Sequence, residues 1–135
     1  MRAHVIRLEH RAGSLAELCE AIGGAGINIT GVAATTWEDR GAVALTTNDP
    51  EATDQLLADR GFDHRAVELV PAALDDRPGS LGEAARRLAE RDINIHAVVP
   101  LGDQDGRRLI GFVVDIPVAA RDALGDLALA DAMLV

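Results

Sequence analysis

Two short stretches of this sequence combine residue types that suit the binding of a small charged molecule. They share one pattern, 66 residues apart. They read Arg11-Ala12-Gly13-Ser14-Leu15 and Arg77-Pro78-Gly79-Ser80-Leu81. Each is followed at the same distance by an asparagine between two isoleucines, in Ile27-Asn28-Ile29 and Ile93-Asn94-Ile95.

These groups could hold a zwitterion, which carries a carboxylate and an ammonium group. The start of a helix presents unpaired amide hydrogens and a partial positive charge, which attract a carboxylate. Gly13 and Gly79 would let ligand atoms approach the backbone closely, because glycine has no side chain. The amides of Asn28 and Asn94 can donate and accept hydrogen bonds at once.

Carboxylates near these turns could meet an ammonium group. Asp75 and Asp76 precede the second turn, and Glu9 precedes the first. Asparagine is also unfavourable in strands, so its repeated placement between two isoleucines calls for a reason.

A purely structural interpretation of the same residues stays open. A Gly-Ser pair suits any turn from a strand into a helix, and a helix cap would use some of the amides offered to a ligand. Asn28 and Asn94 could cap the backbone at a strand start. Arg11 and Arg77 could be solvated charges of the turns.

The surrounding sequence predicts the same order of elements twice. Residues 3–8 alternate as a strand does, and Ser14 with Glu17 predicts a capping box that begins a helix. Ser80 and Glu83 repeat that box. The predicted buried faces of the two helices are Leu15, Leu18, Cys19 and Ile22 in the first and Leu81, Ala84, Ala85 and Leu88 in the second.

Each repeat continues with a hairpin and a second helix. Residues 37–41 and 101–107 are predicted as the hairpin loops, and Pro50 and Pro117 as first residues of helices that run to about Gly61 and Gly125. The repeat offset grows from 66 to 67, which a one-residue difference in an exposed hairpin would explain.

The expected domains are residues 1–66 and 67–135, joined through a shared or continuous strand near residues 63–74. Pro71 would interrupt the hydrogen bonding of that strand and is expected at an edge or a bulge. Residues 127–135 are expected to supply the last strand.

Composition and charge narrow the possible functions. The 135 residues are 48% hydrophobic with a net charge of −9, and neither half is basic. Nucleic-acid binding is therefore not expected. A single cysteine excludes an internal disulfide, and no stretch predicts a signal peptide or a membrane span. We expect a soluble cytoplasmic protein.

Catalytic chemistry is not expected either. The four histidines lack metal-ligand spacing, and Cys19 lies on a predicted buried helix face. The glycine-rich residues 23–31 follow a helix and enter a strand, which is the reverse of a dinucleotide-binding fingerprint. The sequence predicts no enzyme activity, no cofactor and no metal.

The repeated pattern resembles the ACT domain, a small regulatory module of amino-acid metabolism. The second copy, residues 74–81 with Ile93-Asn94-Ile95, is more similar to the family pattern than the first. The first copy has Ala12 where proline is usual and His10 where an acid is common. The resemblance covers nearly the whole chain.

The resemblance implies an α+β fold of two ferredoxin-like βαββαβ modules in tandem, with antiparallel sheets and helices on one face. It also implies a regulatory protein that binds a free amino acid at the interface between ACT modules and modulates a partner enzyme or regulator. A homodimer is expected, without a membrane or nucleic acid as partner. The alternative is a structural or interaction subunit without a ligand.

The predicted ligand-binding residues come from both repeats. They are Arg11, Ala12, Gly13, Ser14, Leu15, Asn28, Ile29, Asp76, Arg77, Pro78, Gly79, Ser80, Leu81, Asn94 and Ile95.

Overall fold

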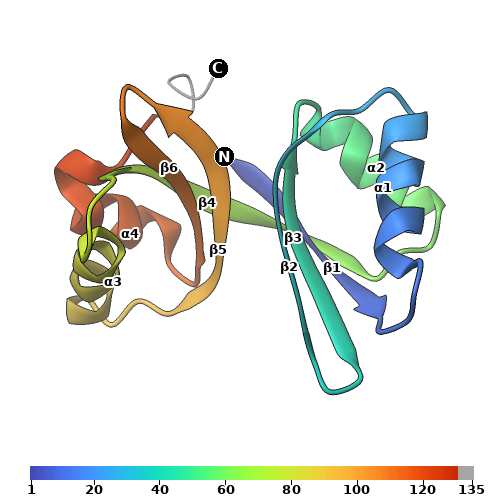
Figure 1. Ribbon diagram of the computed structural model, residues 1–135, viewed down its shortest axis with the longest axis horizontal. Helices are drawn as coiled ribbons and strands as arrows, with labels where there is room; N and C mark the ends of the chain where they lie inside the picture. Colours follow the sequence, from blue (N-terminus) through green and yellow to red (C-terminus); the bar gives the residue numbers. More distant parts are fainter. Residues whose placement is uncertain (131–135) are drawn as a thin grey trace. The chain divides into compact units, whose positions relative to one another are not determined.

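The computed structural model describes residues 1–130, which fold into two compact units. One unit is Arg2–Val67, and the other runs from Glu68 onward and includes Met1. The elements are β1 (Arg2–Glu9), α1 (Ser14–Gly24), β2 (Ile29–Trp37), β3 (Arg40–Thr47), α2 (Pro50–Asp59), β4 (His64–Asp75), α3 (Ser80–Glu90), β5 (Ile95–Gln104), β6 (Arg107–Val114), α4 (Pro117–Leu124) and the short 3-10 helix η1 (Gly125–Leu127). Figure 1 labels the strands and the four α-helices.

The first unit is an antiparallel sheet with two helices on one face. Its strand order is β2-β3-β1-β4, with β1 and β2 both paired antiparallel to β3. Helices α1 and α2 lie against the same face of β1–β3 (Figure 1). Residues shared by the helices and that face form the core, namely Ile6, Leu18, Ile22, Ile27, Val43, Leu45 and Leu57.

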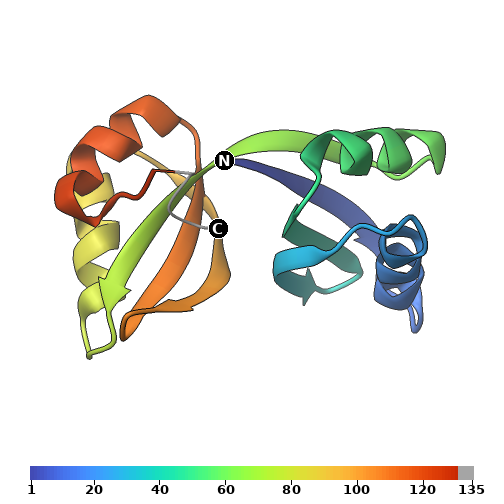
Figure 2. The same cartoon turned by 90° about the horizontal axis from the view of Figure 1, so that it is seen from above.

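The second unit repeats this arrangement. Strands β4, β6 and β5 are adjacent in that order, and both pairings are antiparallel. Helices α3 and α4 cover one face of this sheet (Figure 2). Its core is a separate cluster, made of Val70, Ala72, Leu74, Ala84, Leu88, Ile93, Phe112, Val114, Ala120 and Leu124. The observed architecture confirms the predicted α+β, ferredoxin-like fold class.

The starts of α1 and α3 differ from the predicted capping boxes. The residue that caps α1 is Gly13, with φ +92°, and Ser14 is already helical. Glu17 is therefore one residue too far along to reach back to the cap, and no side chain of the described residues caps this helix. Gly79 caps α3 with the same φ of +92°, again without a side-chain cap. The capping-box prediction is wrong in both units.

The first apolar residue of each helix also differs from expectation. Leu15 and Leu81 are half exposed, whereas Leu18, Ile22, Ala84 and Leu88 are buried as predicted. Cys19 is partly buried. By contrast, Pro50 and Pro117 begin α2 and α4 as predicted, since a first-turn residue needs no amide hydrogen.

The extra residue of the second repeat lies in a strand and not in a loop. Both hairpins turn through only two residues, 38–39 and 105–106. Both sheets share one irregularity near the start of β2 and β5, but β5 has a second one between Pro100 and Gly102. Leu101 is thus a β-bulge, which shifts the repeat offset from 66 to 67.

Pro71 sits opposite Gly111 of β6 without a bulge in that pairing. Its carbonyl accepts a hydrogen bond from the amide of Leu129 at 2.9 Å, and Ala72 pairs with Ala128. Because the amide and carbonyl of a strand residue point to the same side, the missing amide of Pro71 faces Leu129 and leaves the β6 ladder intact. Residues 131–135 of the predicted last strand lie outside the described part of the chain.

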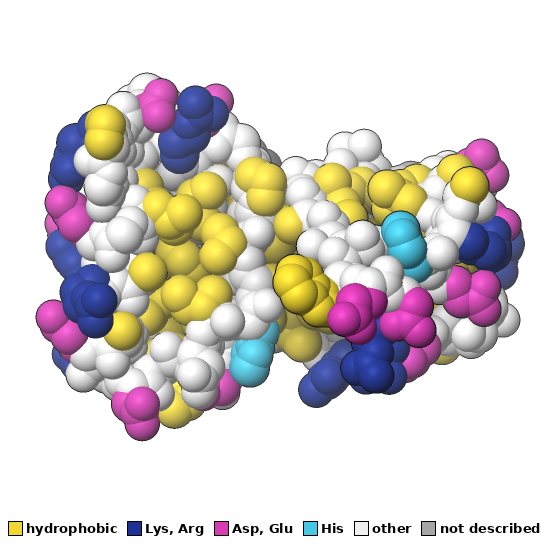
Figure 3. All heavy atoms as spheres, turned by 60° about the horizontal axis from the view of Figure 1, so that its bottom comes forward, with side chains coloured by type: hydrophobic (Ala, Val, Ile, Leu, Met, Phe, Trp, Pro, Cys, Tyr) yellow, Lys and Arg dark blue, Asp and Glu magenta, His cyan; other side chains and the backbone are white. Residues whose placement is uncertain are grey.

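Apolar side chains also lie outside these two cores. Six consecutive residues of β4, from Leu69 to Leu74, are buried, so both faces of this strand are apolar. Figure 3 shows hydrophobic side chains gathered over one face of the second unit. Among the described residues, no helix is both long and apolar enough to span a membrane.

Candidate functional site

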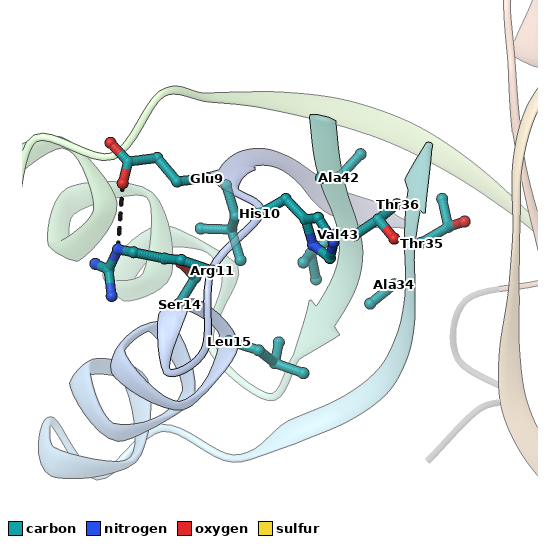
Figure 4. A pocket seen from close by; sticks show the side chains of 12 residues that line it. Glu9, His10, Arg11, Ser14, Leu15, Ala34, Thr35, Thr36, Ala42 and Val43 are labelled. Carbon is teal, nitrogen blue, oxygen red and sulfur yellow. Dashed lines mark hydrogen bonds and ion pairs between the residues drawn. The ribbon is translucent and has the colours of Figure 1, made fainter. Parts of the chain in front are cut away.

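A pocket of about 290 Å³ lies at one end of the first unit's sheet. The turn before α1 forms one side of it, and the ends of β2 and β3 form the other (Figure 4). Its lining residues are Leu8, Glu9, His10, Arg11, Ser14, Leu15, Ala34, Thr35, Thr36, Gly41, Ala42 and Val43. The size is suitable for one small molecule, and all the walls belong to one unit.

The N-terminus of α1 places Ser14 and Leu15 at this pocket. The amide of Ser14 donates to the carbonyl of Arg11 at 3.3 Å, and Glu17 makes the first helical bond to Gly13. Within residues 1–130, the amides of Leu15 and Ala16 have no acceptor. They are among the first four amides of a helix, which have no partner inside it.

The hydroxyl of Ser14 is the clearest sign of a missing partner. Ser14 is 7% exposed and lines the pocket, yet its Oγ has no hydrogen-bond partner within the described chain. Ser80, at the corresponding position of the second unit, is also 7% exposed and its Oγ also lacks a partner there. Buried hydroxyls are normally paired, so each unmatched one calls for an explanation.

Charged groups at the pocket rim are already paired with one another. Arg11 donates to Glu17 at 2.8 and 3.2 Å, and its Nε donates to Glu9 at 3.2 Å. These hydrogen bonds with Arg11 lower the pKa of Glu17. Figure 4 shows the Glu9–Arg11 pair at the outer side of the site. Because the pair is solvated, it contributes little stability and serves mainly to fix the turn.

The inner wall is mostly apolar, with a few neutral polar groups. In Figure 4 the His10 ring extends toward Thr36, and Leu15 extends toward Ala34. Gly41 adds no side chain to this wall. A Cβ at this position would lie 3.0 Å from the carbonyl oxygen of Leu8, so the strand pairing leaves little room for one. The pocket therefore offers amide and hydroxyl donors beside a small apolar surface.

A second, wider hollow of about 770 Å³ adjoins this pocket. It shares Leu8, Glu9, Thr35, Gly41 and Ala42 with the first. Its remaining lining residues are largely charged, namely Arg7, Trp37, Asp39, Arg40 and Asp63. It lacks the helix N-terminus and the unpartnered hydroxyl that distinguish the smaller pocket.

The structure brings together only part of the predicted site in the first unit. Arg11, Ser14 and Leu15 line the pocket, while Ala12 and Gly13 belong to the same turn but do not line it. Asn28 and Ile29 lie at the opposite end of the sheet, because β2 begins there and reaches the pocket only at Ala34–Thr36. Thr36 is seven residue steps along the strand from Ile29, which corresponds to ~23 Å.

The asparagines are part of a repeated backbone cap. The amide of Asn28 donates to Oδ1 of Asn48 at 2.9 Å, and the amide of Asn94 donates to Oδ1 of Asp115 at 3.0 Å. The Asn94 side chain also donates to Asp115 at 2.9 Å, which lowers the pKa of Asp115. The capping side chains are thus Asn48 and Asp115, which the sequence analysis did not single out.

The predicted residues of the second unit form a corresponding turn. Arg77 donates to Glu83 at 3.0 and 3.2 Å, as Arg11 does to Glu17. Asp76, Pro78, Gly79, Ser80 and Leu81 belong to this turn and the start of α3, while Asn94 and Ile95 lie at the start of β5.

Sequence reasoning missed the strand side of the pocket. His10, the β2 residues Ala34, Thr35 and Thr36, and the β3 residues Gly41, Ala42 and Val43 were not predicted. The available signal was a run of small residues in two strands joined by a tight hairpin. Within residues 1–130, no group of His, Cys, Asp or Glu side chains is arranged to hold a metal ion.

Several solved structures are similar to this chain. Protein BT0572 from Bacteroides thetaiotaomicron is 19% identical, with a TM-score of 0.82 over 98% of this chain and 94% of that one. The ligand-free regulatory subunit of aspartate kinase from Thermus thermophilus is 16% identical, with a TM-score of 0.63 over 91% and 89%. The corresponding subunit from Thermus flavus is 15% identical, with a TM-score of 0.60 over 91% and 88%.

No protein-family model matches the chain, and no curated protein matches it. At the identities of the solved structures, the likeness establishes the fold. The chain shares an ACT-type, ferredoxin-like α+β fold with regulatory subunits of aspartate kinase.

Proposed function

We propose that this chain is a non-catalytic regulatory protein that binds a free, neutral aliphatic amino acid in the pocket of its first unit. The observation that carries the proposal is the Ser14 hydroxyl, which is buried in the pocket wall without a partner in the described chain. Within residues 1–130, the amides of Leu15 and Ala16 at the N-terminus of the same helix also have no acceptor. Ser14 and Leu15 both line the pocket, at the helix N-terminus where a carboxylate would gain most from the helix dipole.

The rest of the pocket suits the other parts of an amino acid. An aliphatic side chain would pack against Leu8, Ala34 and Val43, which are apolar residues of the wall. The ammonium group would face the rim, where Thr36 offers an acceptor oxygen and Glu9 a carboxylate that it would share with Arg11. Because Glu9 and Arg11 of the pocket are already paired with each other, a charged ligand side chain would lose hydration without a free opposite charge, so charged amino acids should bind less tightly.

The regulatory part of the proposal rests on the fold and on the neighbours. Two solved neighbours are regulatory subunits of aspartate kinase, an enzyme that acts on an amino acid. By analogy, the partner would be an enzyme or regulator of amino-acid metabolism, and a homodimer is the proposed assembly. A bound ligand changes a partner only through different affinities for two states of the protein.

The binding proposal can be tested by thermal unfolding of the whole chain with each of the twenty L-amino acids in turn. A ligand at 100 times its Kd stabilises the folded protein by about 2.7 kcal/mol. We expect neutral aliphatic amino acids to raise the melting temperature most. If none of the twenty raises it, the sensor proposal fails and a ligand-free structural or interaction subunit remains.

The variant Ser14→Ala tests the position of the site. Its hydroxyl makes no hydrogen bond within the described chain, so its removal should leave the unliganded protein as stable as the parent or slightly more stable. The stabilisation by the ligand should fall, because the carboxylate loses a donor. An unchanged ligand response would place the ligand elsewhere.

A further inference from the structure

The two units differ at the wall of the site. In the first unit Gly41 lies across from Leu8 on β1 and from Thr36 on β2. In the second unit Arg108 takes the same place in the register, across from Leu74 on β4 and from Asp103 on β5. Gly41 of the first unit thus corresponds to Arg108 of the second, which has a long and positively charged side chain.

Arg108 reaches the turn that corresponds to the pocket's other side. Its Nε lies 3.3 Å from Oδ1 of Asp76, and its Nη1 lies 3.3 Å from Oδ1 of Asp103. Its Nη2 also donates to Asp76 at 3.5 Å. The Arg108 side chain therefore connects β6 with β5 and with the turn before α3. It occupies the place that corresponds to the open pocket of the first unit.

Asp76 of the second unit corresponds to His10 of the first. Its neighbour Asp75 is also paired with an arginine. Asp75 lies 3.4 Å from Nε of Arg107, which in turn donates through Nη2 to the carbonyl of Ala73 at 2.7 Å. The carboxylates that the sequence offered to a ligand's ammonium group therefore already face guanidinium groups of the chain itself.

We propose that Arg108 occupies the second unit's ligand site from within, so that the chain binds one amino acid, in the first unit. This inference rests on the proposed function, and it assigns Arg108 as the residue that makes the two repeats unequal. The second unit retains the N-terminus of α3 and the Ser80 hydroxyl, which has no partner within residues 1–130, so Arg108 covers the second site and leaves its other groups in place.

The physical basis is competition for the same volume and the same carboxylates. Arg108 is 56% exposed on its side chain, so each of its ion pairs is weak by itself. A ligand would nevertheless have to displace the guanidinium from two carboxylates at once before its ammonium group could approach Asp76. Removal of the side chain beyond Cβ should therefore expose a second binding site.

The test is the binding stoichiometry of the full chain, measured by titration calorimetry with the twenty L-amino acids, each titrated singly. We expect one site per chain in the parent and two in Arg108→Ala. Arg86→Ala removes the same charge from an exposed position of α3 and should keep one site. In the Arg108→Ala background, Ser80→Ala should weaken the newly opened site, and Ser14→Ala should weaken the original one.

The possible outcomes separate this inference from the proposed function. Two sites in the parent would leave amino-acid binding in place and overturn the role of Arg108. So would one site in Arg108→Ala, or loss of binding in that variant, which would mean that Arg108 holds the ligand. No binding to the parent or to any variant would overturn both proposals.

Discussion

His4 is a buried titratable residue outside the proposed site. Its side chain, in β1, is 1% exposed, and its Nε2 lies 3.4 Å from Oδ1 of Asp54 on α2. The His64 ring of β4 lies 3.5 Å from the same carboxylate oxygen. Burial lowers the pKa of His4, and the nearby His64 and Arg2 lower it further, while Asp54 opposes them. The folded protein therefore favours neutral His4.

This arrangement predicts that the protein loses stability in mild acid. The unfolded chain binds a proton at His4 near pH 6.5, whereas the folded chain does so only at lower pH. Stability from neutral His4 is fully present above about pH 6.5 and falls as pH drops toward the folded pKa. Urea unfolding between pH 5 and 7.5 should show this slope in the parent.

Two variants assign the slope to His4. His4→Gln should flatten it, whatever its effect on stability at neutral pH. Asp54→Asn removes the group that raises the pKa of His4, so its acid sensitivity should be stronger than the parent's. A parent-like slope in His4→Gln would assign the effect to other groups.

At this scale, the residue types of the turn could be read from the sequence, but several of their roles could not. Gly13 was expected to allow a ligand close to the backbone, and its φ of +92° gives it a conformational reason as well. Ser14 was expected as a cap and instead lies in the pocket wall, where its hydroxyl has no partner among the described residues. A shift of the helix start by one residue causes this change, and side-chain spacing alone does not determine such a shift.

At the scale of elements, the turn before each first helix is the most strictly repeated feature. Gly13 and Gly79 both have φ +92° and ψ −13°, and each turn is held by an Arg–Glu pair. The left-handed backbone conformation of this glycine lets the chain pass from the strand into the helix within a few residues. Only glycine adopts that conformation without steric cost.

Two substitutions in the same helix should therefore act in opposite directions. Gly79→Ala forces an L side chain into the left-handed region and should destabilise the protein by about 1–2 kcal/mol. Gly82→Ala lies inside α3, where a Cβ meets nothing within 4 Å, and should stabilise by about 0.5–1 kcal/mol. Urea midpoints measure both changes. A loss of stability in Gly82→Ala as large as that in Gly79→Ala would contradict this explanation.

The elements themselves were largely predictable, because periodicity, proline and glycine mark them locally. The sequence predicted the order of strands and helices and the prolines that begin α2 and α4. It did not predict the bulge at Leu101, because an inserted residue in a strand has no local signature when the neighbouring loop is also polar. The strand side of the pocket was missed for a related reason. Thr36 and Gly41 become neighbours only through the register of a hairpin.

At the scale of the whole chain, the described residues contain two separate apolar cores. One joins Leu18 and Leu57 to the first sheet, and the other joins Leu88 and Leu124 to the second. Strand β4 contributes to both units, since its first residues belong to one and its buried run from Leu69 belongs to the other. Continuous backbone therefore links units whose side-chain packing is separate.

Because the two cores are separate, we expect a destabilising substitution in one unit to lower the local stability mainly of that unit. Leu18 and Leu88 are both fully buried, and truncation of either to alanine should cost about 2–5 kcal/mol. In Leu18→Ala, hydrogen exchange should speed up most at amides of β1 and β3, while β6 keeps its protection. Leu88→Ala should show the reverse pattern and serves as the matched control. Because a single cooperative unit would open as a whole, equal loss of protection in β3 and β6 from either variant would mean that β4 transmits enough free energy to join the two repeats into one domain.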